Sequence, residues 1–316
     1  MVFNKVVVVG GGVLGSQIAF QTSYCGFDVS ILLRSEASIE RSKQKIDKLK
    51  IAYLKSLNNM ENKTEPYFRG LTKEKELTHE QFGELKENVE IAYKNLKFTT
   101  SYEEACKNAD LIIESISEIP QEKAALYKEL AKHMEEKTIL VTNTSSLLPS
   151  QFAADTGRPE KYLALHFSNE IWRNNIAEVM GHADTDKQIY DKVVEFAEQI
   201  NMLPIKLTKE KKSYVFNSLL TPFLDAAKNL WAEDIADPET IDTAWKMGTS
   251  SPVGPFEILD IIGLKTLYFV KSLSPNANNP EHIDYKVAQK FKEMIDQGKL
   301  GVSSGEGFYK YDKEEN

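Results

Sequence analysis

The feature that most constrains the fold is a glycine-rich loop that directly follows a short apolar run near the start of the chain. Lys5–Val9 is β-branched and predicts a buried parallel strand, and Gly10-Gly11-Gly12-Val13-Leu14-Gly15 after it fits the pattern G-x-G-x-x-G. A predicted helix over residues 15–25 and a second predicted strand over 28–33 complete a β-α-β unit. This order of elements is typical of a domain that binds a dinucleotide.

Each glycine of the loop has a physical role in such a site. Gly10 allows the tight turn, Gly12 lets the backbone approach a pyrophosphate, and Gly15 lets helix and strand pack closely. The positive end of the helix dipole favours the phosphates. We therefore predict that Gly10, Gly12, Val13, Leu14 and Gly15 bind the cofactor. A glycine-rich turn without a ligand is the alternative.

The end of the second strand bears on which dinucleotide binds. An NAD site usually has Asp or Glu there to hold the ribose hydroxyls. This chain has Leu33, followed by Arg34 and Ser35. A guanidinium and a hydroxyl suit a ribose 2′-phosphate, so the sequence favours NADP(H), with NAD(H) as the alternative cofactor. The competing interpretation is an arginine that is merely exposed after the strand.

Composition limits the classes of partner. The net charge of −8 disfavours nucleic acid and anionic membranes, although residues 34–55 hold seven basic and three acidic residues, either a solvated face or one that attracts phosphate. Cys25 and Cys106 are expected to be free thiols in a reducing cytoplasm, with no metal-ligand cluster. No stretch approaches the ~20 apolar residues of a membrane span. We expect a soluble cytoplasmic protein.

Predicted strands and helices alternate up to about residue 207 and then give way to helices alone. The further strands are predicted at 97–100, 110–114, 138–142, 162–166 and 203–207, and the further helices at 36–57, 79–95, 121–135 and 185–200, with a polar loop or arm tip at 58–77. This predicts an α/β, Rossmann-like, doubly wound parallel sheet over residues 1–208. Helical periodicity at 211–232, 238–248, 254–272 and 281–297 predicts a smaller all-helical domain over 209–316.

One histidine stands where a doubly wound sheet presents its ligand site. His166 ends a predicted strand, and Glu178 follows twelve residues later in a second strand-like run. Two strands joined by a turn can bring that carboxylate to the imidazole, where it fixes the tautomer and raises the basicity of the other ring nitrogen. Such a pair suits the proton transfer that accompanies hydride transfer at an alcohol carbon. A structural histidine is the alternative.

At these residues the sequence resembles the L-3-hydroxyacyl-CoA dehydrogenase (3-hydroxybutyryl-CoA dehydrogenase) family. The resemblance covers almost the whole chain and is carried by GGGVLG at 10–15, ADLIIESISE at 109–118, NTSSL at 143–147, LHF at 165–167, AEVM at 177–180, VFNSLLTPFL at 215–224, SPVGPFEILDIIGL at 251–264 and GEGFYKY at 305–311. It implies reversible oxidation of a (3S)-3-hydroxyacyl group, an acyl-CoA-type substrate, a nicotinamide cofactor and a place in fatty acid metabolism. It also implies a helical C-terminal domain that dimerises.

The resemblance assigns roles residue by residue. It implies that His166 is the catalytic base, that Glu178 orients it, and that Ser145 binds the substrate oxygen near the nicotinamide. It implies that Asn217 completes the polar site from the second domain. Three further positions match the cofactor side of the family site: Glu114, Lys123 and Asn143.

The chain departs from the family where substrate contacts are expected. Phe167-Ser168-Asn169-Glu170 stands in place of Phe-Phe-Asn-Pro, and Lys211-Lys212-Ser213-Tyr214 stands where the family commonly has Pro-Gly. A coenzyme A thioester is therefore the default substrate, and free 3-hydroxy acids or small diketones, used by relatives with this fold, are the alternative. A non-catalytic, crystallin-like protein that binds the cofactor is disfavoured because the four catalytic positions are filled.

The apolar residues after position 210 predict a homodimer. They offer more apolar faces than about 108 residues cover alone, although a monomeric core is the alternative. The residues concerned are Leu219, Leu220, Phe223, Leu224, Ile258, Leu259 and Ile262.

Overall fold

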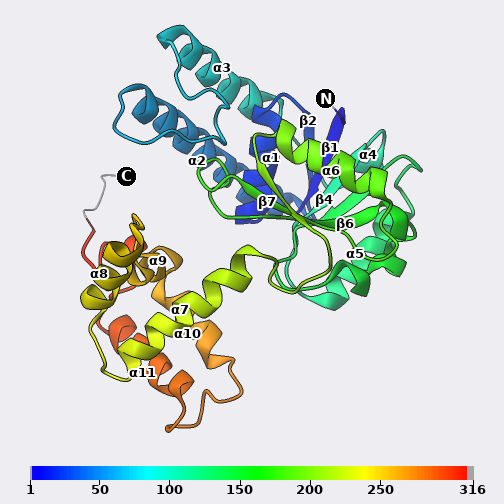
Figure 1. Cartoon of the computed structure of the whole chain (residues 1–316). Coiled ribbons are helices and arrows are strands. Elements are labelled where there is room, and N and C mark those ends of the chain that lie inside the picture. Colours follow the sequence, from blue (N-terminus) through cyan, green and yellow to red (C-terminus); the bar gives the residue numbers. More distant parts are fainter. Residues whose placement is uncertain (1, 312–316) are drawn as a thin grey trace. The chain divides into compact units, whose positions relative to one another are not determined.

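An eight-stranded sheet forms the centre of the first part of the chain in the computed structural model, which describes residues 2–311 (Figure 1). Its strand order is β3-β2-β1-β4-β5-β6-β7-β8, and only the β6–β7 pair is antiparallel. The strands are β1 (Lys5–Val9), β2 (Asp28–Leu32), β3 (Lys97–Thr99), β4 (Leu111–Glu114), β5 (Ile139–Thr142), β6 (Tyr162–Phe167), β7 (Ile176–Met180) and β8 (Leu203–Leu207). The predicted Rossmann-like, doubly wound sheet is confirmed.

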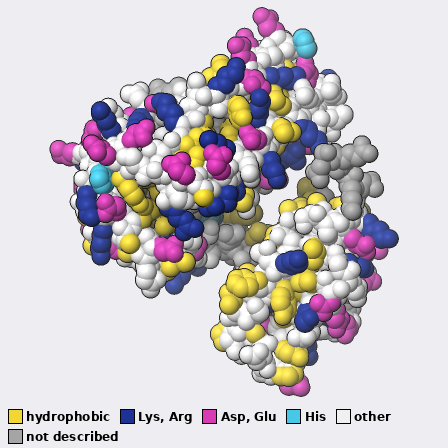
Figure 2. All heavy atoms as spheres, turned by 180° about the vertical axis from the view of Figure 1, so that it is seen from behind, with side chains coloured by type: hydrophobic (Ala, Val, Ile, Leu, Met, Phe, Trp, Pro, Cys, Tyr) yellow, Lys and Arg dark blue, Asp and Glu magenta, His cyan; other side chains and the backbone are white. Residues whose placement is uncertain are grey.

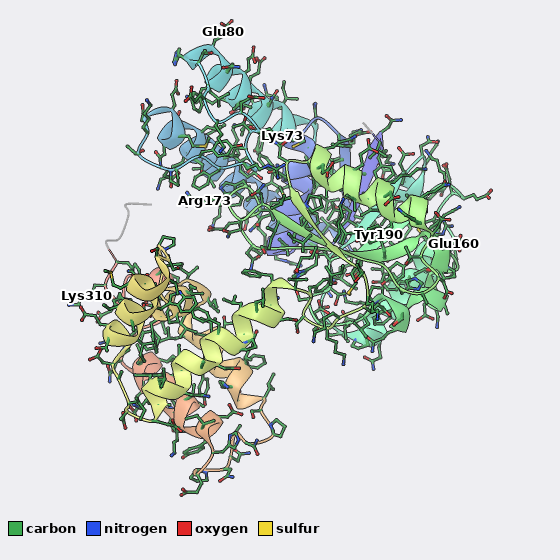
Figure 3. All side chains as sticks on the ribbon, in the orientation of Figure 1. Lys73, Glu80, Glu160, Arg173, Tyr190 and Lys310 are labelled. Carbon is green, nitrogen blue, oxygen red and sulfur yellow. The ribbon has the colours of Figure 1, made fainter. Side chains whose placement is uncertain are left out.

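Helices cover both faces of the sheet, which explains why four consecutive residues of β1, Val6 to Val9, are apolar and buried. Val6 and Val8 face the core shared with α1 (Val13–Tyr24) and α6 (Lys187–Gln199). Val7 and Val9 face the opposite core, built with α4 (Tyr102–Cys106) and α5 (Pro120–Ala131). Tyr190 of α6, labelled in Figure 3, places its hydroxyl within 3.1 Å of the Val179 carbonyl oxygen on β7. Both faces are thereby buried, as a parallel sheet requires.

A helical arm, α2 (Glu36–Glu61) and α3 (His79–Asn95), projects from the sheet (Figure 1). The connection between the two helices, residues 62–78, is held to the segment that follows β6. Arg173 of that segment, labelled in Figure 3, donates to Glu65 at 2.7 Å and lies over the ring of Phe68. The predicted loop begins later than expected because residues 58–61 continue α2.

The chain divides between Val215 and Phe216, after which the described residues form a helical unit. Residues 209–215 belong with the first unit because they bind to β6 and β7, a tertiary contact that helical periodicity does not reveal. The helices are α7 (Phe216–Ala232), α8 (Pro238–Thr249), α9 (Pro255–Ile262), α10 (Leu264–Ser272) and α11 (Ile283–Asp296). The predicted helix over 254–272 is two helices, divided at Gly263 with φ +91°. No helix among residues 2–311 has the length and apolar character needed to cross a membrane.

Candidate active site

A cavity of about 660 Å³ lies at the carboxyl ends of β1, β2 and β4, where the strand order reverses. Gly10 has φ +106°, and a Cβ there would lie 2.5 Å from the Ser115 carbonyl oxygen. A Cβ on Gly15 would lie 2.2 Å from the Gly10 carbonyl oxygen. Only glycine permits these close approaches, which bring the turn and the start of α1 against the sheet.

The start of α1 opens toward this cavity. Gly12, the N-cap residue of α1, lines it, and a Cβ on Gly12 would meet no protein atom within 4 Å. In the first turn, Val13 is exposed and Leu14 packs against the core of the sheet. Backbone N–H groups at an open helix start favour phosphate. The loop, the helix start and the cavity therefore fit a dinucleotide.

Cationic side chains line the part of the cavity next to β2. Arg34 is exposed there, and α2 contributes Arg41 and Lys45 to the same wall. Ser35 was predicted to bind the cofactor, but its hydroxyl accepts the backbone N–H of Ser38 and caps the start of α2. Ser38, and not Ser35, is among the residues that line the cavity. Arg41 and Lys45 were not among the predicted cofactor residues, although their spacing of four places both on one face of a helix.

Two predicted cofactor-side residues form a buried ion pair beneath the cavity. Glu114 is fully buried and accepts from Lys123 at 2.7 Å, from the Ile116 N–H at 2.8 Å and from the Thr142 hydroxyl at 2.7 Å. The Tyr127 hydroxyl donates to the second carboxylate oxygen, and burial raises the pKa of Tyr127 well above its usual range. A buried carboxylate with these partners is fully compensated. Glu114 and Lys123 thus brace the segment after β4, which lines the cavity.

His166 and Glu178 face each other across the antiparallel pair of β6 and β7. The register pairs the two residues directly, so their side chains lie on the same face of the sheet. His166 Nδ1 lies 3.0 Å from Glu178 Oε2, and both side chains are buried. A carboxylate only accepts hydrogen bonds, so Nδ1 carries the hydrogen and Nε2 carries the lone pair. Glu178 Oε1 accepts the Val215 N–H at 2.8 Å.

The polar residues after β5 lie at the same edge of the sheet. Asn143 Oδ1 accepts the N–H of Phe167, the residue after His166, at 3.0 Å. Ser145 is exposed, and its N–H donates to Glu118 at 2.7 Å. Glu118, which was not among the predicted site residues, also accepts the Thr144 hydroxyl. Loop 143–145 is therefore fastened beside the end of β6.

One contact on His166 has no counterpart among the predicted site residues. The ring of Tyr214 stacks on the imidazole with centroids 4.5 Å apart and planes 16° apart. Its hydroxyl donates to the Thr144 carbonyl oxygen at 2.7 Å. No periodicity marks this residue, because it lies in the irregular segment before α7. Asn217 is in the first turn of α7, in the second unit, so its place in the site stays a prediction.

The comparisons with known proteins agree over both units. Residues 5–211 match the 3-hydroxyacyl-CoA dehydrogenase NAD binding domain, and residues 214–311 match the C-terminal domain of the same family. The chain is 30% identical to human mitochondrial hydroxyacyl-coenzyme A dehydrogenase, covering 98% of this chain and 92% of that protein. It is also 30% identical to 3-hydroxybutyryl-CoA dehydrogenase of Clostridioides difficile, covering 98% and 100%.

A solved structure is also similar over nearly its full length. It is a diketoreductase described as performing substrate-directed dual catalysis of dicarbonyl compounds. The TM-score is 0.85 at 42% identity, covering 98% of this chain and 99% of the other.

Proposed function

This chain belongs to the 3-hydroxyacyl-CoA dehydrogenase family, enzymes that act on CH–OH groups with NAD, and we propose that His166 performs the proton transfer in that reaction. The observation that carries the proposal is the register pair of His166 and Glu178, with Nδ1 3.0 Å from the carboxylate. That arrangement leaves Nε2 to exchange a proton with a hydroxyl.

In the proposed oxidation, different residues of the chain accept the proton, stabilise the charge that forms and hold the substrate. Gly10, Gly12 and Arg34 of the cavity would hold a nicotinamide dinucleotide, which would supply the acceptor for the hydride of C3 when bound. His166 Nε2 takes the proton of the substrate hydroxyl as the C–O bond becomes C=O, and Glu178 stabilises the resulting imidazolium. Ser145 and Asn217 are proposed to hold the substrate oxygens. In reduction, His166 returns the proton to the oxygen of C3.

The proposed substrate is a (3S)-3-hydroxyacyl-CoA or its 3-oxoacyl counterpart, after the names of the two family domains. A second candidate is a free dicarbonyl compound. It is favoured by the 42% identity to the diketoreductase, against 30% to the hydroxyacyl-CoA dehydrogenases.

A substrate panel tests the choice. Reduction of acetoacetyl-CoA and of a free β-diketone ester is measured with one reduced cofactor, using His166→Gln as the inactive control. A higher kcat/KM for acetoacetyl-CoA supports the thioester, and a higher value for the free ester supports the second candidate. Failure of the unmodified protein to reduce either compound with either cofactor would contradict the proposed function.

For the cofactor, we propose a preference for NADP(H) within a domain of the NAD-binding type. Leu33 stands where a carboxylate would repel a 2′-phosphate, and Arg34 and Arg41 line the adjoining wall. A charge-assisted hydrogen bond contributes about 1.5–3 kcal/mol, or roughly ten- to a hundredfold in affinity. This exceeds the loss of one neutral contact to the ribose.

Cofactor choice is measured as kcat/KM for NADPH and NADH at one substrate concentration. We expect NADPH to be preferred, and Arg34→Ala to reduce that preference roughly tenfold or more, with little change for NADH. Lys43→Ala is a matched control, because Lys43 is on α2 but pairs with Glu40 outside the cavity. Equal or better use of NADH by the unmodified protein would refute the preference. An unchanged preference in Arg34→Ala would remove Arg34 from it.

We also propose a homodimer formed through the second unit, and the cytoplasm as the compartment. Large apolar side chains are exposed on α7, α9 and α10, which supports an interface with a second copy. Both cysteines are free thiols, which suits a reducing compartment.

A further inference from the structure

Two side chains hold the imidazole of His166: the carboxylate of Glu178 and the ring of Tyr214. Glu178 binds Nδ1 at 3.0 Å, which fixes one atom of the ring. The ring torsion of a histidine is broad, so a single hydrogen bond leaves the plane of the ring poorly defined. The Tyr214 ring lies nearly parallel to the imidazole, at 16°, and so defines that plane.

Tyr214 is itself held rigidly. It is fully buried, and its hydroxyl donates to the Thr144 carbonyl oxygen at 2.7 Å. Burial raises the pKa of Tyr214 far above neutral, so the phenol keeps the proton that it donates. The next residue, Val215, donates its N–H to the second oxygen of Glu178 at 2.8 Å. One short segment therefore holds both members of the His–Glu pair.

The backbone of this segment is unusual. Ser213 has φ +66° and Tyr214 has φ +52°, and consecutive non-glycine residues in the left-handed region carry conformational strain. A bulky aromatic residue adopts this region only when surrounding contacts impose it. Here those contacts are the imidazole, the Thr144 carbonyl and Glu178.

We propose that Tyr214 is a positioning residue that sets the ring plane of His166 and, through Thr144, fastens the loop that carries Ser145. The inference rests on the proposed role of His166 in proton transfer. The aromatic face also lies against the imidazolium that forms when His166 takes a proton, a favourable cation–π arrangement. Loss of the ring is expected to impair proton transfer while the cofactor still binds.

The test compares Tyr214→Leu with Tyr214→Phe. The leucine variant removes the aromatic face, and we expect kcat to fall roughly 10- to 100-fold while KM for substrate and cofactor changes little. The phenylalanine variant keeps the aromatic face and loses the hydroxyl bond to Thr144, so we expect a smaller fall in kcat than in the leucine variant, and this fall measures the contribution of the fastened loop. Tyr24→Leu is the matched control, because Tyr24 is buried and donates to the Leu71 carbonyl oxygen at 2.8 Å, away from the pair.

A double-mutant cycle separates positioning from general destabilisation. If Tyr214 acts through His166, adding Tyr214→Leu to His166→Gln should cause no further loss of kcat. Additive losses, a normal kcat in Tyr214→Leu, or an equal loss in Tyr24→Leu would each overturn the inference. Near-normal turnover by His166→Gln alone would instead refute the proposed function. Cofactor binding checks the folding of every variant, and Tyr214→Met replaces the leucine variant if that one does not bind cofactor.

Discussion

At the scale of the residue, the proposed proton transfer depends on which nitrogen of His166 is free to accept a proton. Glu178 lies against Nδ1 with its other oxygen bound to the Val215 N–H, so the carboxylate cannot rotate away without losing a hydrogen bond. The imidazole and the carboxylate are both buried, which strengthens their electrostatic coupling. These contacts therefore fix the orientation of the imidazole that the proposed proton transfer requires.

Replacing the base should separate turnover from binding. In His166→Gln, the amide cannot take up the hydroxyl proton, and we expect kcat to fall by roughly 10²–10⁴. The dissociation constant of the cofactor, measured by fluorescence titration, should stay close to that of the unmodified protein. Glu178→Gln should lower kcat less, since the base is retained but is poorly oriented. A His166→Gln enzyme with nearly normal turnover would rule out this assignment.

The sequence predicts the positions of some residues of the candidate site and not of others. His166 and Glu178 were predictable because strand ends and a twelve-residue separation together suggest a hairpin. Tyr214 was not, since its stacking arises from a left-handed backbone that no sequence pattern marks. The family resemblance implied cofactor-side roles for Glu114 and Lys123, which stay predictions, and it did not reveal that the two side chains are buried and paired with each other.

At the scale of the element, the glycine loop shows how closely a helix and a turn can approach. Gly15→Ala would place a Cβ 2.2 Å from the Gly10 carbonyl oxygen, so the start of α1 must shift. We expect the free energy of unfolding to fall by about 1–3 kcal/mol and cofactor affinity to fall with it. Urea denaturation and cofactor titration measure the two effects.

Gly83 of α3 provides a control in which the same substitution should change the free energy of unfolding in the opposite direction. A Cβ there meets no atom within 4 Å, and the position is an exposed helix interior. Gly83→Ala should raise the free energy of unfolding by about 0.5–1 kcal/mol, because alanine loses less backbone entropy in a helix. An equal change in the free energy of unfolding in Gly15→Ala and Gly83→Ala would contradict the claim that a Cβ on Gly15 collides with the Gly10 carbonyl oxygen.

The observed bounds of the helices show which elements the hydrophobic periodicity of the sequence can predict and which it cannot. The helix α3 was predicted at its observed bounds, 79–95, and in the structure Thr78 and Gln81 form a capping box at its start. The longer helix α2 was predicted to end at 57 and continues to Glu61. The short helix α4 and the 3₁₀ turns at 149–161 were missed, since elements of three to five residues have no measurable period. Gly263 divides a predicted single helix because its φ of +91° breaks the helical backbone while the apolar pattern continues.

At the scale of the whole molecule, exposed apolar side chains gather on the second unit, as Figure 2 shows from one side. The residues predicted to form the interface divide into two groups. Leu224 and Leu259 are buried, while Leu220, Phe223 and Ile258 pack against the same core of the unit. Leu219 and Ile262 are exposed. The proposed interface therefore rests on other side chains as well, in particular Ile261, Phe269, Val270 and Leu273.

The homodimer has a direct physical test. Sedimentation equilibrium should give twice the 35.8 kDa of one chain at working concentration. Phe269→Glu places a charge in the exposed apolar group on α10 and should shift the mass toward the monomer. Ile51→Glu, at an equally exposed apolar position on α2, should leave the mass unchanged. A monomer mass for the unmodified protein would refute the dimer.

The hairpin of β6 and β7 has a consequence for how enzymes of this kind diversify. The ladder register brings His166 opposite Glu178, so the position of the proposed reactive pair follows from the pairing of the two strands. The connection between the two strands, residues 168–175, leaves Asn169, Glu170 and Asn174 exposed. Substitutions at those exposed positions leave the register of the two strands unchanged. The proposed proton transfer therefore depends on the strands, and the connection between them is free to vary in sequence.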